Sequence, residues 1–147
     1  MFYEHYRSVD QNDIQLNAVG FDLRHYQKLH RQLILATRIT YNTSFGAAKV
    51  KYQLGGVDNW MFASSENAGN APSSVNYGFQ ALATNLRGFN QNIRSGNSFA
   101  VINSEIRFPI FSYLFNRPIR SAFISNFQLV PFFDIGTAWV GSDPYSE

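Results

Sequence analysis

The sequence predicts an all-β fold of long antiparallel strands, and three observations lead to this prediction. Apolar and polar residues alternate with a period of two along most of the chain. Several alternating segments are longer than the roughly 5–6 residues of a typical strand. Aromatic residues make up 16% of the chain and charged residues only 15%. These features are typical of a transmembrane β-barrel segment, in which each strand has one apolar and one polar face. A soluble β-sandwich would also fit them.

The first third of the chain is predicted to form three strands, at about 2–9, 14–29 and 31–46. In the second strand, the apolar residues Val19, Phe21 and Leu23 alternate with the charged residues Asp22, Arg24 and Lys28. In the third strand, the alternating residues are Leu33, Leu35, Thr37, Ile39 and Tyr41 on one face and Gln32 and Arg38 on the other. A short turn near 29–31 joins the two. Both strands exceed the about 9–11 residues that cross a bilayer at a tilt.

The last third is predicted to form two further strands with the same two-faced pattern, at about 98–113 and 122–140. In the first of them, the polar face carries Asn103, Glu105 and Arg107. In the second, the polar face carries Asn126, Gln128, Asp134 and Gly136, with Val130 and Phe132 as apolar exceptions. Pro109 and Pro131 each remove a donor from the ladder of hydrogen bonds, which indicates a bulge, a strand end or a sheet edge.

The stretch from about 55 to 97 is predicted to be one long loop, because it is rich in Asn, Ser, Gly and Ala and lacks sustained alternation. Loops of this length are uncommon in compact domains and are usually functional or disordered. Long loops at one end of the strands and short turns at the other are typical of outer-membrane barrels, whose long loops are extracellular. No repeat or linker divides the chain, so we expect one domain over 1–147.

Composition excludes several classes of function. The chain has no cysteine, which excludes disulfides, thiolate metal sites and a cysteine nucleophile. Its net charge of +2 comes from scattered basic residues, so no nucleic-acid partner is expected. The three histidines lack acidic neighbours at ligand spacing, and no glycine-rich phosphate loop precedes a helix. We therefore expect no enzyme activity, no metal and no cofactor.

The sequence also predicts neither a transmembrane helix nor a signal peptide. No run of 18 apolar residues is present, so the sequence predicts no transmembrane helix. The first residues, MFYEHYRSVD, lack the basic and apolar regions of a signal peptide.

Four motifs then occur in a fixed order: YQLGGVDN, NLRGF, NSEIRFPIF and FFDIGTAWVG. With them, residues 14–141 resemble the C-terminal barrel region of the bacterial surface antigen family, which includes BamA-type outer-membrane insertases and two-partner-secretion transporters. The resemblance implies an antiparallel barrel of about 16 strands in the bacterial outer membrane, of which this chain would supply about five. It also implies a role in outer-membrane protein assembly or protein translocation. The implied partners are the lipid bilayer and unfolded outer-membrane proteins or a secreted polypeptide.

The resemblance further implies that the long loop folds back into the barrel lumen. Its motif would be Leu86, Arg87, Gly88 and Phe89, and the arginine would contact acidic groups on the inner wall, here Glu105 and Asp134. The alternation by itself already places both acids on the polar faces of their strands. A guanidinium group can hold two carboxylates at once.

Other residues near this motif have expected roles. Phe89 is expected to wedge against the wall near Phe132, and Gly136 to allow close approach of the loop. Arg107 shares the polar face and is a rival partner for the two acids. Glu105 and Asp134 could also form a paired-carboxylate site of the glycosidase type, but the neighbouring arginines favour a structural ion network.

Two alternatives remain open at this point. One is a soluble β-sandwich or lipocalin-like binding module, and the other is a structural surface barrel without a transport role. Because five strands are too few to close a barrel, we expect the chain to be a piece of a larger protein or a truncated one.

Overall fold

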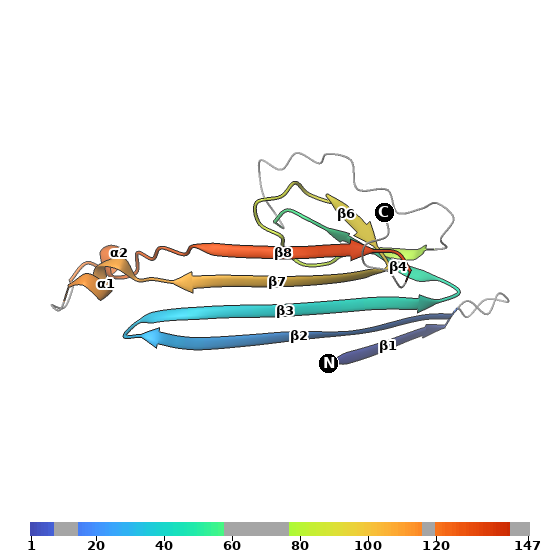
Figure 1. The fold of residues 1–147 in the computed structure, drawn as a ribbon, viewed down its shortest axis with the longest axis horizontal. Helices are drawn as coiled ribbons and strands as arrows, with labels where there is room; N and C mark the ends of the chain where they lie inside the picture. The colour runs from blue at the N-terminus through green and yellow to red at the C-terminus, as the bar shows by residue number, and fades with distance from the viewer. Residues whose placement is uncertain (8–14, 58–76, 116–119, 142–147) are drawn as a thin grey trace.

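The computed structural model describes residues 1–7, 15–57, 77–115 and 120–141. These residues form a mostly β structure of eight strands in two sheets, with two short helices (Figure 1). The predicted fold is confirmed for these residues in its coarser form, as a mostly β structure, whereas the two helices and the parallel pair β4/β5 were not predicted. Neither described helix has the length and hydrophobicity to cross a membrane.

The larger sheet consists of strands at the five positions that the alternation predicts. It is antiparallel throughout, in the order β1-β2-β3-β7-β8. Its strands are β1 (Phe2–Arg7), β2 (Gln15–His30), β3 (Leu33–Gly46), β7 (Ser98–Arg107) and β8 (Phe132–Trp139). With 16 residues in β2 and 14 in β3, the central strands are much longer than the roughly 5–6 residues usual in soluble sheets.

The last two predicted strands are too long, and the two prolines explain why. Strand β7 ends at Arg107, and Pro109 precedes the short helix α1 (Ile110–Leu114). Helix α2 (Ala122–Ser125) lies where the second strand was predicted to begin, and β8 starts only after Pro131. The apolar residues of these segments continue the parity of the strands, but a proline has no N–H to donate to a ladder.

The segment predicted as one long loop contains two strands of the smaller sheet. This sheet has the order β5-β4-β6, and its strands are β4 (Lys49–Leu54), β5 (Tyr77–Leu82) and β6 (Arg94–Gly96). Strand β4 runs parallel to β5 and antiparallel to β6. All three strands are short, and β4 was not predicted either, although its six residues alternate. Their partners are distant in sequence, which no local pattern encodes.

The two faces of the larger sheet differ in polarity, and its apolar face is the exposed one. Leu23, Ile39, Ile102 and Ile135 pair in register across β2, β3, β7 and β8 and form one apolar row. All four side chains are at least 40% exposed. The adjacent register positions on the opposite face are polar: Arg24, Arg38, Asn103 and Asp134. We call these two surfaces the apolar face and the polar face.

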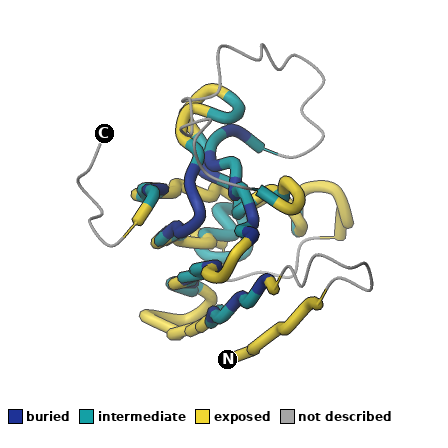
Figure 2. Tube along the Cα trace, turned by 90° about the vertical axis from the view of Figure 1, so that its right-hand side faces the viewer, coloured by how far each residue is buried: buried dark blue, intermediate teal, exposed yellow. Residues whose placement is uncertain are grey.

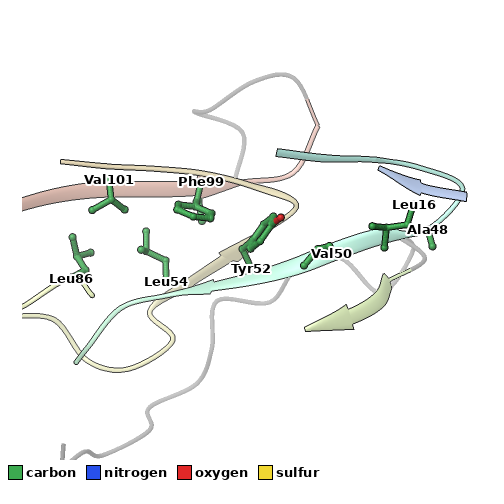
Figure 3. Close-up of a cluster of buried hydrophobic side chains, with 9 residues drawn as sticks. Leu16, Ala48, Val50, Tyr52, Leu54, Leu86, Phe99 and Val101 are labelled. Carbon is green, nitrogen blue, oxygen red and sulfur yellow. The ribbon is translucent and has the colours of Figure 1, made fainter. Parts of the chain in front are cut away.

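The core lies on the polar face, at the end of the larger sheet where the smaller sheet covers it. Strand β4 alternates, and its residues Val50, Tyr52 and Leu54 are buried. Leu54 and Tyr52 lie opposite Val101 and Phe99 of β7 (Figure 3), with the Tyr52 and Phe99 rings 5.0 Å apart. The Val50 N–H donates to the Ser44 hydroxyl of β3 at 2.9 Å. Figure 2 shows this buried centre in dark blue, whereas β1 beside the N-terminus is exposed along its length. The smaller sheet therefore positions the segment after β5 over the polar face.

Candidate functional site

The loop that carries the Arg-Gly-Phe motif leaves β5 and is held by backbone contacts to the end of β4. The N–H of Ala83 donates to the carbonyl of Gln53 at 2.9 Å, and the N–H of Leu86 donates to that of Gly56 at 3.0 Å. Gly88 has a φ of +87°, in the left-handed region that glycine adopts readily and most other residues avoid. We call residues 83–93 the arginine loop.

Arg87 binds Asp134 of β8 with three hydrogen bonds. Its Nε and its backbone N–H donate to Oδ2, and Nη2 donates to Oδ1, each at 2.8 Å. The Asp134 side chain is fully buried. A buried carboxylate is tolerated when it is paired and hydrogen-bonded, and the forked guanidinium meets both oxygens at once.

Glu105 of β7 is shared between two arginines. Its Oε2 accepts a bond from Arg87 Nη1 at 3.0 Å, and its Oε1 accepts bonds from Arg107 Nη2 and Nε at 2.6 and 2.8 Å. Arg107 therefore joins the network on the other oxygen of Glu105. Two positive and two negative charges balance one another here.

Arg87 of the arginine loop also contacts an aromatic ring. The Arg87 guanidinium carbon lies 4.3 Å from the centre of the Phe132 ring, within the range of a cation–π contact. Phe132 is one of the two apolar exceptions predicted on the polar face of its strand, and the contact with Arg87 gives a reason for its position. Hydrogen bonding to Asp134 raises the pKa of the Arg87 guanidinium, and the side chain stays charged.

Leu86 of the arginine loop packs next to Gly136 of β8. Leu86 is buried in the core cluster. A Cβ atom built on Gly136 would lie 3.3 Å from Leu86 Cδ1 and only 2.8 Å from Val101 Cγ2. The absent side chain thus leaves room for the loop to approach the strand. Phe89, expected to be the wedge, is instead 48% exposed, and Leu86 is the buried residue of the motif.

A second set of contacts to the arginine loop was not predicted. Arg38 Nη1 donates to Thr84 Oγ1 at 2.9 Å, and Asn103 Nδ2 donates to the carbonyl of Asn85 at 3.0 Å. Arg38 also pairs with Asp22 at 2.7 Å. The alternation placed Asp22 and Arg38 on the polar face, but Thr84 and Asn85 carry no sequence signal of their own.

A cavity of about 230 Å³ lies beside these contacts. Its lining includes Arg24, Tyr26, Arg38, Arg87 and Glu105. Within the described ranges, no three His, Asp or Glu side chains converge to hold a metal ion. Glu105 and Asp134 are both bound by arginines, so the arrangement can fix the loop to strands β7 and β8.

Comparisons with protein-family models, curated proteins and solved structures found no match to this chain.

Proposed function

We propose that this chain forms part of an outer-membrane β-barrel of the bacterial surface antigen superfamily, with a role in outer-membrane protein assembly or protein translocation. The observation that carries the proposal is the division between the two faces of the long-stranded sheet. The arginine loop is bound to the polar face, while the opposite apolar face is exposed.

The exposed apolar face fits contact with lipid. A soluble sheet buries its apolar face against another layer, whereas a membrane barrel turns that face outward. The row Leu23, Ile39, Ile102 and Ile135 crosses four adjacent strands. Large contiguous apolar patches are rare on soluble monomers and mark interaction or membrane surfaces.

The polar face fits the wall of a lumen that holds a loop. Arg87 bonds with charged groups from two neighbouring strands, Glu105 of β7 and Asp134 of β8. Held in this way, the loop narrows the space beside the wall. In a barrel lumen, the anchored loop would then help to set the shape of the path of a polypeptide in transit.

One observation favours a soluble β-sandwich as the second candidate. The smaller sheet packs on one face of the larger sheet and shares a core with it, which resembles the two layers of a sandwich. In that case the apolar face would need a further cover.

Lipid contact can be tested with a single tryptophan. Trp60 and Trp139 are replaced by Phe, and the chain is reconstituted in vesicles that contain phospholipids with brominated acyl chains. Phe133 is 64% exposed on the apolar face, so Phe133→Trp fluorescence should be quenched strongly. Tyr26→Trp is the matched control, because Tyr26 is similarly exposed on the polar face, and it should keep most of its emission.

Equal quenching at the two positions, or a chain that stays monomeric and soluble without detergent, would overturn the barrel proposal. The role in assembly needs a second measurement. Vesicles that contain the chain should speed the insertion of a urea-unfolded outer-membrane barrel relative to empty vesicles. Equal insertion rates would instead favour a structural barrel without a transport role.

A further inference from the structure

Helices α1 and α2 lie at the end of the larger sheet that is far from the smaller sheet (Figure 1). This end carries several exposed aromatic residues. It comprises residues 108–115 and 120–131, which include α1 and α2, and we call it the aromatic turn. Phe123 is 80% exposed, and Leu114, Phe115 and Phe127 are also exposed. Neither helix has a buried residue. The aromatic turn thus has no core of its own to cover these side chains.

Contacts among the rings hold the aromatic turn together without burying it. Phe111 lies 5.8 Å from Phe127 and stacks on Phe115, and Phe108 lies 4.8 Å from Tyr113. His30 Nδ1 lies 2.8 Å from the Tyr113 hydroxyl, which ties the aromatic turn to the β2–β3 turn. The apolar surface is therefore pre-formed.

The described charges on the aromatic turn and on the β2–β3 turn are positive, and the nearby Glu105 is bound by Arg107 and Arg87. The sequence from 108 to 131 contains no Asp or Glu. Arg31 of the β2–β3 turn lies 5.9 Å from the Tyr113 ring centre, and Arg120 is exposed beside α2. Among the described residues, the acids are Glu4, Asp22, Glu105 and Asp134, and all belong to the strands. This end is therefore complementary to a surface that is both apolar and anionic.

The aromatic turn continues the apolar face. Phe108 and Leu129 pair through two backbone hydrogen bonds of 2.9 Å beyond the ends of β7 and β8. Leu129 is 53% exposed and has the same parity as Phe133 and Ile135. A lipid layer along the apolar face would thus reach the aromatic turn at its edge.

We propose that the aromatic turn docks into the interfacial layer of a bilayer of anionic phospholipids. Phe123, Leu114 and Phe115 enter the boundary between headgroups and acyl chains, where aromatic residues are favoured. Arg31 and Arg120 bind the lipid phosphates, as basic residues beside a membrane do. The inference rests on the proposed function for its orientation: the docked leaflet is the one opposite the side of the arginine loop.

The test uses the full chain in vesicles, with Trp60 and Trp139 replaced by Phe and Phe123→Trp as the reporter. The vesicles mix phosphatidylcholine with phosphatidylglycerol, and bromine is placed near the headgroup of one lipid or the other. Brominated phosphatidylglycerol should quench the reporter more strongly than brominated phosphatidylcholine. The double substitution Arg31→Gln with Arg120→Gln should remove this preference. Each arginine lost should lower association with phosphatidylglycerol, relative to phosphatidylcholine, about fivefold.

Lys49→Gln with Lys51→Gln is the matched control. It removes the same charge from the smaller sheet and should leave the lipid preference unchanged. Leu114→Trp is a second reporter, so that the result does not depend on one substitution.

The outcomes separate this proposal from the barrel proposal. Quenching of Phe133→Trp without quenching of either reporter in the aromatic turn overturns the docking and leaves the barrel standing. Quenching in the aromatic turn without quenching at Phe133 supports docking and overturns the membrane-spanning sheet. Equal quenching of the reporters by the two brominated lipids overturns docking to anionic lipid. Reporters that are shielded from acrylamide but not quenched by bromine also overturn it, and they assign the surface to a protein partner.

Discussion

At the scale of single residues, the distinctive feature is a buried carboxylate whose partner comes from a distant loop. Asp134 accepts three hydrogen bonds from Arg87, which lies 47 positions earlier in the chain. Burying a charge is costly unless a partner compensates for it. The pair therefore couples the position of the arginine loop to the charge of Asp134 in β8.

Replacement of Arg87 should release the arginine loop. Arg87→Ala leaves the Asp134 carboxylate without its guanidinium, and breaking a buried pair costs about 3 to 5 kcal/mol. We expect much faster cleavage of the loop by proteinase K in the reconstituted protein. Arg87→Lys should lie in between, because lysine keeps the charge but loses the fork.

Arg94→Ala is the matched control for this prediction, because Arg94 is exposed in the same part of the chain. It should leave the cleavage rate unchanged. If Arg87→Ala cleaves no faster than the parent protein, Arg87 does not hold the loop.

A side chain at Gly136 should also loosen the loop. The leucine in Gly136→Leu would occupy the space of Leu86 and collide with Val101, and overpacking costs typically about 1 to 3 kcal/mol. Leu86→Ala should partly rescue Gly136→Leu, so that the double variant is more stable than the sum of the single effects predicts. Denaturant melts of the four proteins give this coupling.

Ile135→Leu serves as the neighbouring control for this series, since Ile135 lies on the apolar face. Strictly additive effects of the Gly136 and Leu86 substitutions would contradict the contact between the two positions.

At the scale of elements, strand β4 decides where the arginine loop lies. One face of β4 is buried against the larger sheet, and its neighbours β5 and β6 flank the loop in sequence. Gly96 of β6 supports this placement: a Cβ at Gly96 would clash with the backbone of Trp139 in β8. The smaller sheet therefore acts as the platform of the site.

Truncation of Leu54 should undock this platform. Leu54 is fully buried, and Leu→Ala substitutions in a core cost about 2 to 5 kcal/mol. Hydrogen exchange should show faster exchange of amides in β4, β6 and the arginine loop, with β2 and β3 still protected. Lys51→Ala, on the other face of β4, should change none of these rates. Uniform loss of protection in both sheets would mean that the platform does not open separately.

At the scale of the whole molecule, the two faces of the larger sheet point to two different environments. The polar face carries the ion network and the smaller sheet, and the apolar face carries a row of exposed aliphatic residues. A single sheet with an uncovered apolar face is not stable in water, because that face must be buried against another layer or lipid. This division is the basis of the barrel proposal.

A charge in the middle of the apolar row should be costly in the membrane. Ile102→Lys places an ammonium group on that row. A lysine near the bilayer midplane destabilises a barrel by about 2 to 4 kcal/mol. Tyr26→Lys is the control, because Tyr26 lies on the polar face, where it lines a cavity together with Glu105. The fraction of chain folded in vesicles, measured by urea titration, should fall for Ile102→Lys only. Similar folding of both variants would argue against lipid on the apolar face.

The sequence alone determined the long strands and their two faces. Alternation is a local property with a period of two, so it placed Asp22, Arg38, Glu105 and Asp134 on the polar face without a partner being known. The Arg-Gly-Phe motif and its family resemblance also named Arg87, Glu105 and Asp134 before the contact was seen.

The tertiary structure decided what local patterns do not encode. The short strands β4, β5 and β6 form only through pairing over long separations. Pro109 and Pro131 left open whether the strands bulge or end, and only the structure shows that β7 ends at Arg107 and β8 begins at Phe132. The choice of Leu86 rather than Phe89 as the buried residue depends on the space above Gly136. Each of these features depends on contacts between residues far apart in the sequence, whereas the alternation of polarity along a strand is a property of the local sequence.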